Sequence, residues 1–299
     1  MWYYKAFVIV ALAMPGLCTS WGNGTVATTT TGNVTRAILN HPPLNVCDAT
    51  FLADLEAFLE SLQVTHLPPP KVVIISSAVA GSFMYHIDLH ILSTRQPVNG
   101  DPLQSLAALA QYNNIMGMLN SLPVIFIGEV SGAAFGAGNE FLVQMDMRFA
   151  STGAKFGSQE ASLGIFPAGG ATPYLTRLVG PGIASEYLLS AQDVDSDTAA
   201  ELGWVNRVFS SVEDMQNYTD TLAARIGLFP AGGLEATKRS IRNFGPSAAD
   251  VAGDQAEFLV LNPQDDAQDL FDKWFNISNN ETPGPFEAGL LANIVELYG

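Results

Sequence analysis

The sequence predicts an α/β protein with a helical C-terminal region. Two apolar runs, residues 71–77 (KVVIISS) and 123–130 (PVIFIGEV), are typical of strands buried on both faces of a parallel sheet. Helical patterns alternate with these strands, and from about residue 212 the chain is mostly helical. We therefore expect an α/β core over residues 34–228 and a helical region over 229–299.

The first two helices carry clear start signals. Asp48 or Thr50 can cap a helix, and the apolar residues that follow fall on one helical face. Those residues are Phe51, Leu52, Leu55, Phe58, Leu59 and Leu62. Asp101 and Pro102 begin a second helix, since proline suits the first helical position. Its core candidates are Leu103, Leu106, Ala110, Met118 and Leu119.

Shorter elements complete the expected core. A glycine-rich turn leads into a short helix from about Gly138. We interpret the threonine-rich run 21–33 as a polar linker, with an edge strand as the alternative. The other expected elements are strands at 34–40, 147–151, 155–157 and 204–209 and helices at 183–190, 197–202, 212–228 and 234–244.

Composition restricts the class of partner. The chain has 299 residues, is 48% hydrophobic and carries a formal net charge of −16 with only 13 Lys and Arg. Nucleic-acid binding depends on basic side chains that meet phosphates, so we expect no nucleic-acid partner. The hydrophobic content suffices for one large domain or two small ones.

The N-terminus predicts entry into the secretory pathway. Residues 1–20 have one lysine, an apolar run and then small residues, the layout of a signal peptide with cleavage between Cys18 and Ser20. An uncleaved anchor is the alternative and would be the only membrane attachment. Cys47 alone cannot close an internal disulfide. Secretion agrees with five possible glycosylation sites, at Asn23, Asn33, Asn217, Asn276 and Asn280.

Common nucleotide and hydrolase motifs are absent from the sequence. A GxGxxG motif would need glycine at Phe141, and neither GK[ST] nor GxSxG occurs. The segment His86-Ile-Asp-Leu-His90 would present three metal ligands on one face only if it were a strand. We expect no metal there.

Glu140 and Glu160 are the informative pair of acidic residues. Glu140 follows the glycine turn, where a helix N-terminus would favour its ionised form. Glu160 precedes the uncharged run ASLGIFPAGG, which would raise its pKa. Two carboxyl groups with separated pKa values can move protons to and from carbon. The alternative is that both are surface residues near loops.

The run PVIFIGEVSGAAFGAGNEFLVQMDMRFASTGAKFGSQEASLGIFPAGG resembles the signature region of the crotonase (enoyl-CoA hydratase/isomerase) superfamily. The resemblance extends over roughly residues 34–245. It implies a ββα superhelix with a C-terminal helical trimerisation part, and hence a homotrimer or hexamer. It also implies an acyl thioester substrate, with CoA as part of the substrate and no separate cofactor.

The family resemblance also implies roles for individual residues. Two backbone N–H groups would bind the thioester oxygen as it becomes an enolate, and Glu140 and Glu160 would position water and exchange protons. The backbone donors would be Ile87 and Ala137. The substrate pocket would be completed by Tyr85, His86, Gly136 and Gly138.

This chain departs from the family pattern at three points. Tyr85 and His86 stand where the family has small residues, and Ala137 replaces a glycine. A secreted protein would rarely meet acyl-CoA. The cations Lys238, Arg239 and Arg242 are interpreted as a solvated helix face, with a nucleotide phosphate site as the alternative.

Three functions remain open from the sequence. The first is an enzyme that hydrates, dehydrates or isomerises an acyl thioester, and the presence of both glutamates favours hydration. The second is a secretory-pathway enzyme acting on a carbonyl compound that is not a CoA ester, favoured by Tyr85, His86 and the signal peptide. The third is a scaffold protein that kept the fold and lost turnover, since one fold hosts many functions.

Overall fold

The computed structural model describes residues 17–63, 69–282 and 284–299. They form two sheets with helices on their faces, and the larger sheet has the strand order β1-β2-β3-β4-β6-β8-β11. The first three strands pair antiparallel, and from β3 onward every pair is parallel. Its strands are β1 (Leu17–Trp21), β2 (Val26–Thr31), β3 (Val34–Leu39), β4 (Val72–Ser77), β6 (Ile125–Val130), β8 (Met147–Ser151) and β11 (Arg207–Phe209).

A smaller sheet runs beside the first, with the strand order β10-β9-β7-β5. Its strands are β5 (Ser82–Met84), β7 (Ala133–Phe135), β9 (Lys155–Gly157) and β10 (Val194–Asp195). The strands β4, β6 and β8 of the large sheet are each followed by a short strand of the small sheet. A helical segment then follows each short strand. This repeat confirms the predicted crotonase-like ββα arrangement.

The helices of the core begin where the sequence predicted. Asp48 caps α1 (Ala49–Ser61), and Asp101 with Pro102 at the first position begins α3 (Pro102–Ser121). The other core helices are α2 (Leu89–Leu92), η1 (Val98–Gly100), α4 (Ala137–Val143), η2 (Glu160–Leu163), α5 (Ala171–Val179), α6 (Pro181–Ser190) and α7 (Ser196–Leu202).

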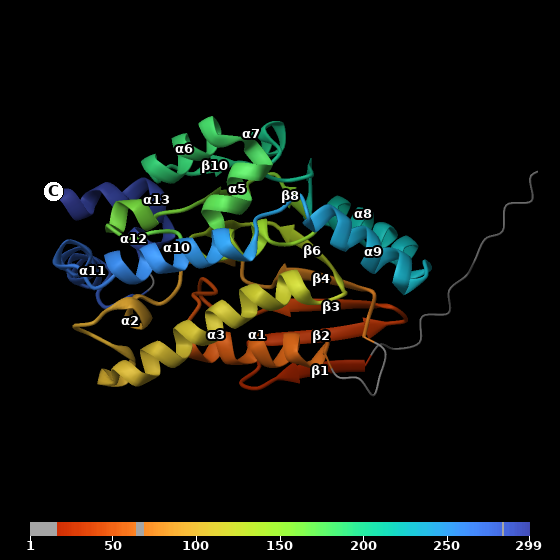
Figure 1. The fold of residues 1–299 in the computed structure, drawn as a ribbon, viewed down its shortest axis with the longest axis horizontal. Helices are drawn as coiled ribbons and strands as arrows, with labels where there is room; N and C mark the ends of the chain where they lie inside the picture. Colours follow the sequence, from red (N-terminus) through yellow and green to blue (C-terminus); the bar gives the residue numbers. More distant parts are fainter. Residues whose placement is uncertain (1–16, 64–68, 283) are drawn as a thin grey trace, which may run out of the picture.

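The C-terminal region is helical, as predicted. Figure 1 shows α8 and α9 at one end of the molecule, α11 to α13 at the other, and α10 crossing between α5 and α3. These elements are α8 (Val212–Gly227), α9 (Ala231–Arg242), α10 (Ala248–Leu261), α11 (Asp265–Ile277), α12 (Pro285–Ala288), α13 (Leu290–Asn293) and η3 (Ile294–Tyr298). No helix in the described ranges is long and apolar enough to cross a membrane.

The buried core confirms the apolar face of α1 but only part of that of α3. All six apolar residues predicted for the first helix are buried. In α3, Met118 and Leu119 are buried, whereas Leu103 and Leu106 are 74% and 60% exposed and Ala110 is also exposed. The helix has apolar residues on several sides, so periodicity alone did not identify its buried face.

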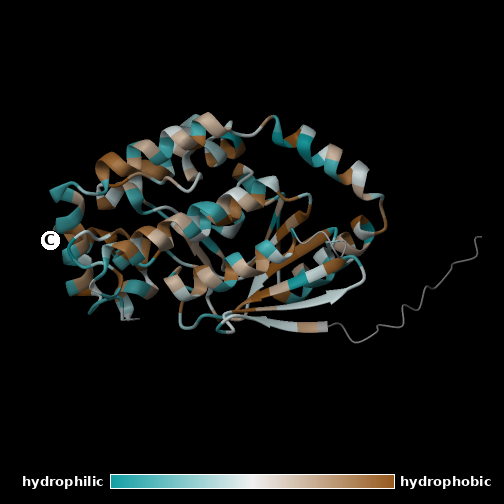
Figure 2. Cartoon of the chain, turned by 60° about the horizontal axis from the view of Figure 1, so that its bottom comes forward, coloured by the Kyte–Doolittle hydropathy of each residue, from teal (hydrophilic) through white to brown (hydrophobic). Residues whose placement is uncertain are grey.

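The interpretation of residues 21–33 as a linker is wrong. Figure 2 shows pale, weakly hydrophobic residues in the strands at this edge, whereas the central strands are strongly hydrophobic. β2 nevertheless pairs with β1 on one side and β3 on the other. The turn before β2 is held by Asp54, whose carboxylate accepts hydrogen bonds from the backbone N–H groups of Asn23 and Thr25 at 2.9 and 3.0 Å. Threonine is favoured in β-strands, which explains why this threonine-rich run forms β2.

The N-terminal predictions meet the structure only in part. Residues 1–16, most of the predicted signal peptide, lie outside the described residues. Cleavage between Cys18 and Ser20 would remove part of β1, which pairs with β2 over its whole length. All five asparagines of the predicted glycosylation sites are exposed.

Candidate active site

A cavity of about 120 Å³ lies among α3, α4, η2 and α10. Most of its wall is apolar, from residues such as Leu109, Phe166 and Phe258. Five of the residues in the wall carry the chemistry considered below, and they are Ile87, Tyr112, Ala137, Glu140 and Glu160. The structure therefore brings together both predicted glutamates and both predicted backbone donors.

Glu140 is held in the first turn of α4. Its Oε1 accepts a hydrogen bond from the backbone N–H of Gly169 at 2.9 Å, and the Tyr112 hydroxyl donates to Oε2. A side chain at position 169 would overlap this carboxylate and the Tyr112 hydroxyl, so only glycine fits. Burial raises the pKa of Glu140 to about 7, although these hydrogen bonds favour the charged form. The net direction of the pKa is therefore upward, because the loss of solvent outweighs the groups that favour the ionised form.

Glu160 begins η2, and two residues separate it from the strand β9. Its side chain is buried, and Oε2 has no hydrogen-bond partner in the part of the chain that the structure describes. Burial and the charge of Glu140 raise the pKa of Glu160 to about 8, which confirms the predicted direction. The neighbouring Gln159 has an Oε1 that likewise lacks a partner there. Buried polar atoms are nearly always paired, so these two atoms indicate a place where a polar ligand binds.

The backbone N–H groups of Ile87 and Ala137 are available to a ligand. Neither donates a hydrogen bond to any of the described residues. Ala137 is the first residue of α4, where N–H groups have no partner within the helix. The peptide groups on either side of Ile87 are already paired with Cys47. The Asp88 N–H donates to Cys47 O at 3.2 Å, and the Cys47 N–H donates to His86 O at 2.9 Å.

Gly138 holds the two donor segments against each other. Its N–H donates to the carbonyl oxygen of Tyr85 at 3.1 Å. A Cβ at this position would overlap the backbone carbonyl of Met84, so the approach requires glycine. Gly136 has a φ of +49° and ends the turn before α4. Neither glycine is among the residues that line the cavity, so both act through the backbone they shape.

Tyr85 and His86 do not line the cavity, and the prediction that they complete the pocket is wrong. The Tyr85 hydroxyl donates to the carbonyl oxygen of Ala288 at 3.3 Å. His86 is 1% exposed, and its Nε2 lies 2.9 Å from Oε2 of Glu287. The other carboxylate oxygen of Glu287, Oε1, accepts a hydrogen bond from Trp274 Nε1 at 2.8 Å. These bulky residues therefore point toward the C-terminal segment.

His86 and Glu287 form a buried ion pair. Burial alone would lower the pKa of His86, but the charge and hydrogen bond of Glu287 outweigh it and raise that pKa. The other ring nitrogen, Nδ1, donates to the carbonyl oxygen of Ile87 at 2.8 Å. A residue of the C-terminal region thus helps to fix the backbone at Ile87.

The prediction of a solvated cationic face on α9 is wrong for two of its three residues. Lys238 is buried, and its Nζ donates to Val124 O at 2.5 Å and pairs with Asp146 at 3.0 Å. Arg242 also pairs with Asp146, at 3.0 Å. Only Arg239 is exposed to solvent as predicted. The pairing with Asp146 ties α9 to the core.

Sequence reasoning missed several residues of the cavity. Tyr112 lies on α3 and carries no local signal beyond its place on the buried face. Gln159 lies between the two motif residues Gly157 and Glu160, and no pattern in the sequence marks it as a cavity residue. The residues from α10 could not be predicted, because no motif marks this helix and its packing against α3 and α5 is a property of the whole fold.

Comparison with known proteins places the chain in a family. The Enoyl-CoA hydratase/isomerase family model matches residues 29–250, so the chain belongs to the enoyl-CoA hydratase/isomerase family, within the crotonase superfamily. The chain is 30% identical over 196 residues to the short-chain-enoyl-CoA hydratase of Clostridium acetobutylicum, covering 65% of this chain and 72% of the relative. It is 32% identical to the crotonyl-CoA hydratase of Syntrophomonas wolfei, covering 53% of this chain and 59% of the relative.

Solved structures agree with this assignment. A crystal structure of a Streptomyces avermitilis protein, provisionally classed as an enoyl-CoA hydratase, superimposes with a TM-score of 0.80 at 34% identity. The match covers 93% of this chain and 98% of that chain. The predicted crotonase-like fold is confirmed.

Proposed function

We propose that this protein is a hydratase that adds water to the double bond of an α,β-unsaturated acyl thioester. The observation that carries the proposal is one cavity lined by two buried glutamates and by two backbone N–H groups without acceptors among the described residues. The named relatives are hydratases of CoA thioesters. The apolar wall suits the hydrocarbon part of such a substrate, and CoA enters only as part of the substrate.

The backbone donors would stabilise the charge that develops on the substrate. The thioester oxygen accepts hydrogen bonds from the N–H groups of Ile87 and Ala137. Attack of water at the β-carbon moves electrons onto this oxygen, giving an enolate. Fixed donors aimed at a developing charge, in a cavity shielded from solvent, are usually the largest catalytic contribution.

The two glutamates would divide the proton transfers. Glu140 has the lower of the two raised pKa values, about 7, and takes a proton from the attacking water. Burial and the charge of Glu140 raise the pKa of Glu160, which favours its protonated form, and Glu160 gives its proton to the α-carbon. The water oxygen forms a bond to the β-carbon, so the product is a 3-hydroxyacyl thioester. A proton transfer from Glu140 to Glu160 then resets the pair.

The structure weakens the support for a carbonyl substrate outside the CoA esters. That hypothesis rested on Tyr85 and His86 as pocket residues, and both point away from the cavity. Only the N-terminal segment still supports it. The third hypothesis, a scaffold without turnover, is an outcome of the following test.

The test is a hydration assay on four proteins. Enoyl-CoA esters of increasing chain length are supplied to the full-length chain, and loss of the conjugated thioester is followed by absorbance. Glu140→Gln and Glu160→Gln should each lower kcat by roughly 10²–10⁴-fold, the usual contribution of a positioned acid or base. Glu201→Gln, an exposed glutamate on α7, is the matched control and should keep normal activity. Equal turnover in all four proteins would remove the glutamates from the mechanism, and no turnover in any would favour the scaffold.

We also propose that the chain self-associates and enters the secretory pathway. Self-association is supported by apolar side chains exposed around α9, including Ile241 at 66% and Phe244 at 80%. Sedimentation of the purified protein would distinguish a trimer or hexamer from a monomer. Mass spectrometry of the mature protein would identify its first residue and so test cleavage. Cleavage after Cys18 would remove part of β1.

A further inference from the structure

Asp88, His90 and Glu281 lie close together outside the cavity. Asp88 caps α2, His90 lies within that helix, and Glu281 follows α11, 192 residues after Leu89. One ligand atom from each residue lies within 4.8 Å of the other two. The metal site considered from sequence needed a strand with His86, Asp88 and His90 on one face. That arrangement does not occur, because the segment turns into α2 and His86 binds Glu287.

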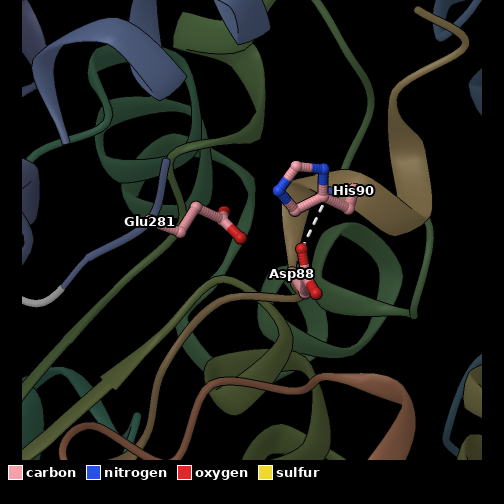
Figure 3. Close-up of side chains that lie close together, drawn as sticks. All are labelled: Asp88, His90 and Glu281. Carbon is pink, nitrogen blue, oxygen red and sulfur yellow. Dashed lines mark hydrogen bonds between the residues drawn. The ribbon is translucent and has the colours of Figure 1, made fainter. Parts of the chain in front are cut away.

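His90 is oriented as a metal-binding histidine usually is. Its Nδ1 donates to the carbonyl oxygen of Gln96 at 2.8 Å, which leaves the lone pair on Nε2. The ring stacks on Phe275 with centroids 4.5 Å apart. Figure 3 shows the ring edge that carries the other nitrogen directed toward Glu281. A second hydrogen bond that fixes the tautomer and ring orientation is typical of histidine ligands.

The two carboxylates are placed where a cation would be favourable. The Glu281 side chain is 10% exposed, and its Oε1 accepts a hydrogen bond from the Leu89 N–H at 3.0 Å. Oδ1 of Asp88 accepts from the His90 N–H at 2.8 Å. The backbone thus fixes both carboxyl groups side by side, and Nδ1 of His86 lies 3.9 Å from Oε1 of Glu281. A divalent cation would add attraction to both carboxylates.

We propose that Asp88, His90 and Glu281 bind a divalent cation of the zinc class. One imidazole nitrogen and two carboxylate oxygens are ligands that Zn²⁺ accepts, whereas Mg²⁺ and Ca²⁺ prefer oxygen alone. Water would fill the remaining position. The site joins the segment after α11 to the start of α2, where Ile87 and Leu89 line the cavity. Metal binding would therefore fix the start of α2 from outside.

Calorimetric titration with Zn²⁺ tests the proposal on the full-length chain after chelator treatment. We expect one ion per chain, with much weaker binding of Mg²⁺, and an increase in Tm when Zn²⁺ is present. Glu281→Gln and His90→Gln should each weaken Zn²⁺ binding at least 10-fold. His41→Gln is the matched control, because His41 lies 2.8 Å from Asp48 in a histidine–acid pair elsewhere. Binding by this control should equal that of the wild type.

Other outcomes would overturn the proposal. No Zn²⁺ binding below millimolar concentration would mean that these three residues hold no metal, and equal binding by Glu281→Gln would place the ion elsewhere. If the variants fail to fold, the absorption spectrum of the Co²⁺-loaded wild type decides. Ligation by nitrogen and oxygen gives no thiolate charge-transfer band, whereas such a band would place the metal on Cys18 or Cys47. Neither readout depends on the proposed hydratase activity.

Discussion

The two segments that carry the backbone donors are held in place by different means. The turn at residues 135–138 is shaped by its own glycines, by the positive φ of Gly136 and by the missing side chain of Gly138, which admits the Met84 carbonyl. The segment at residues 83–88 depends on distant parts of the chain. His86 pairs with Glu287, 201 residues further on, and Tyr85 reaches Ala288.

This difference explains why the sequence predicted one segment better than the other. Glycines have a local steric meaning, so the turn itself could be predicted without the fold. The donor roles of Ala137 and Ile87 were implied by the family resemblance. The roles of Tyr85 and His86 depend on a partner in α12, which no local pattern reveals. Bulky residues that seem to fill a pocket can instead anchor a segment from another part of the chain.

The largest expected effect comes from breaking the anchor of the second segment. Glu287→Gln leaves His86 buried without its counter-charge, and removal of one partner of a buried pair costs about 3–5 kcal/mol. The measurement is the free energy of unfolding in urea. Asp193→Asn, which breaks the more exposed Lys155–Asp193 pair, should cost less than about 1 kcal/mol. If Glu287→Gln also lowered the free energy of unfolding by less than about 1 kcal/mol, the anchor would contribute little to stability.

A smaller effect is expected from separating the two segments. Gly138→Ala places a methyl group against the Met84 carbonyl, and such overpacking costs about 1–3 kcal/mol. Activity should fall as well, because Ala137 N–H and Ile87 N–H move apart. Gly232→Ala, in α9 with open space around it, is the matched control and should be neutral or slightly stabilising. Unchanged stability and turnover in Gly138→Ala would contradict the account of this contact.

The smallest effect concerns the titration of Glu160. Its folded pKa of about 8 lies above the ordinary value of 4.5, so the folded state favours the protonated form. That stability is fully present below about pH 4.5 and is lost as pH rises through about 8. Glu160→Gln should therefore be more stable than wild type at pH 8–9, with the difference vanishing near pH 4. Thermal unfolding across this range is the measurement, and a constant difference would contradict the raised pKa.

The sequence predicted most of the fold and the chemical centre of the site. Strand and helix signals located the α/β core, and the family resemblance implied the ββα arrangement and a shared site for both glutamates. Packing that depends on distant partners was not predicted. The exposure of Leu103, the burial of Lys238 and the pairing of Glu281 with Asp88 all arise from contacts between elements far apart in the chain.

Product analysis in D₂O tests the central claim most directly. The full-length protein is incubated with a short enoyl-CoA ester, and the product is identified by mass spectrometry and NMR. The account predicts a 3-hydroxyacyl-CoA with deuterium on the α-carbon, formed by wild type and not by Glu160→Gln. A product with a shifted double bond and no added hydroxyl would contradict hydration and assign the cavity to isomerisation.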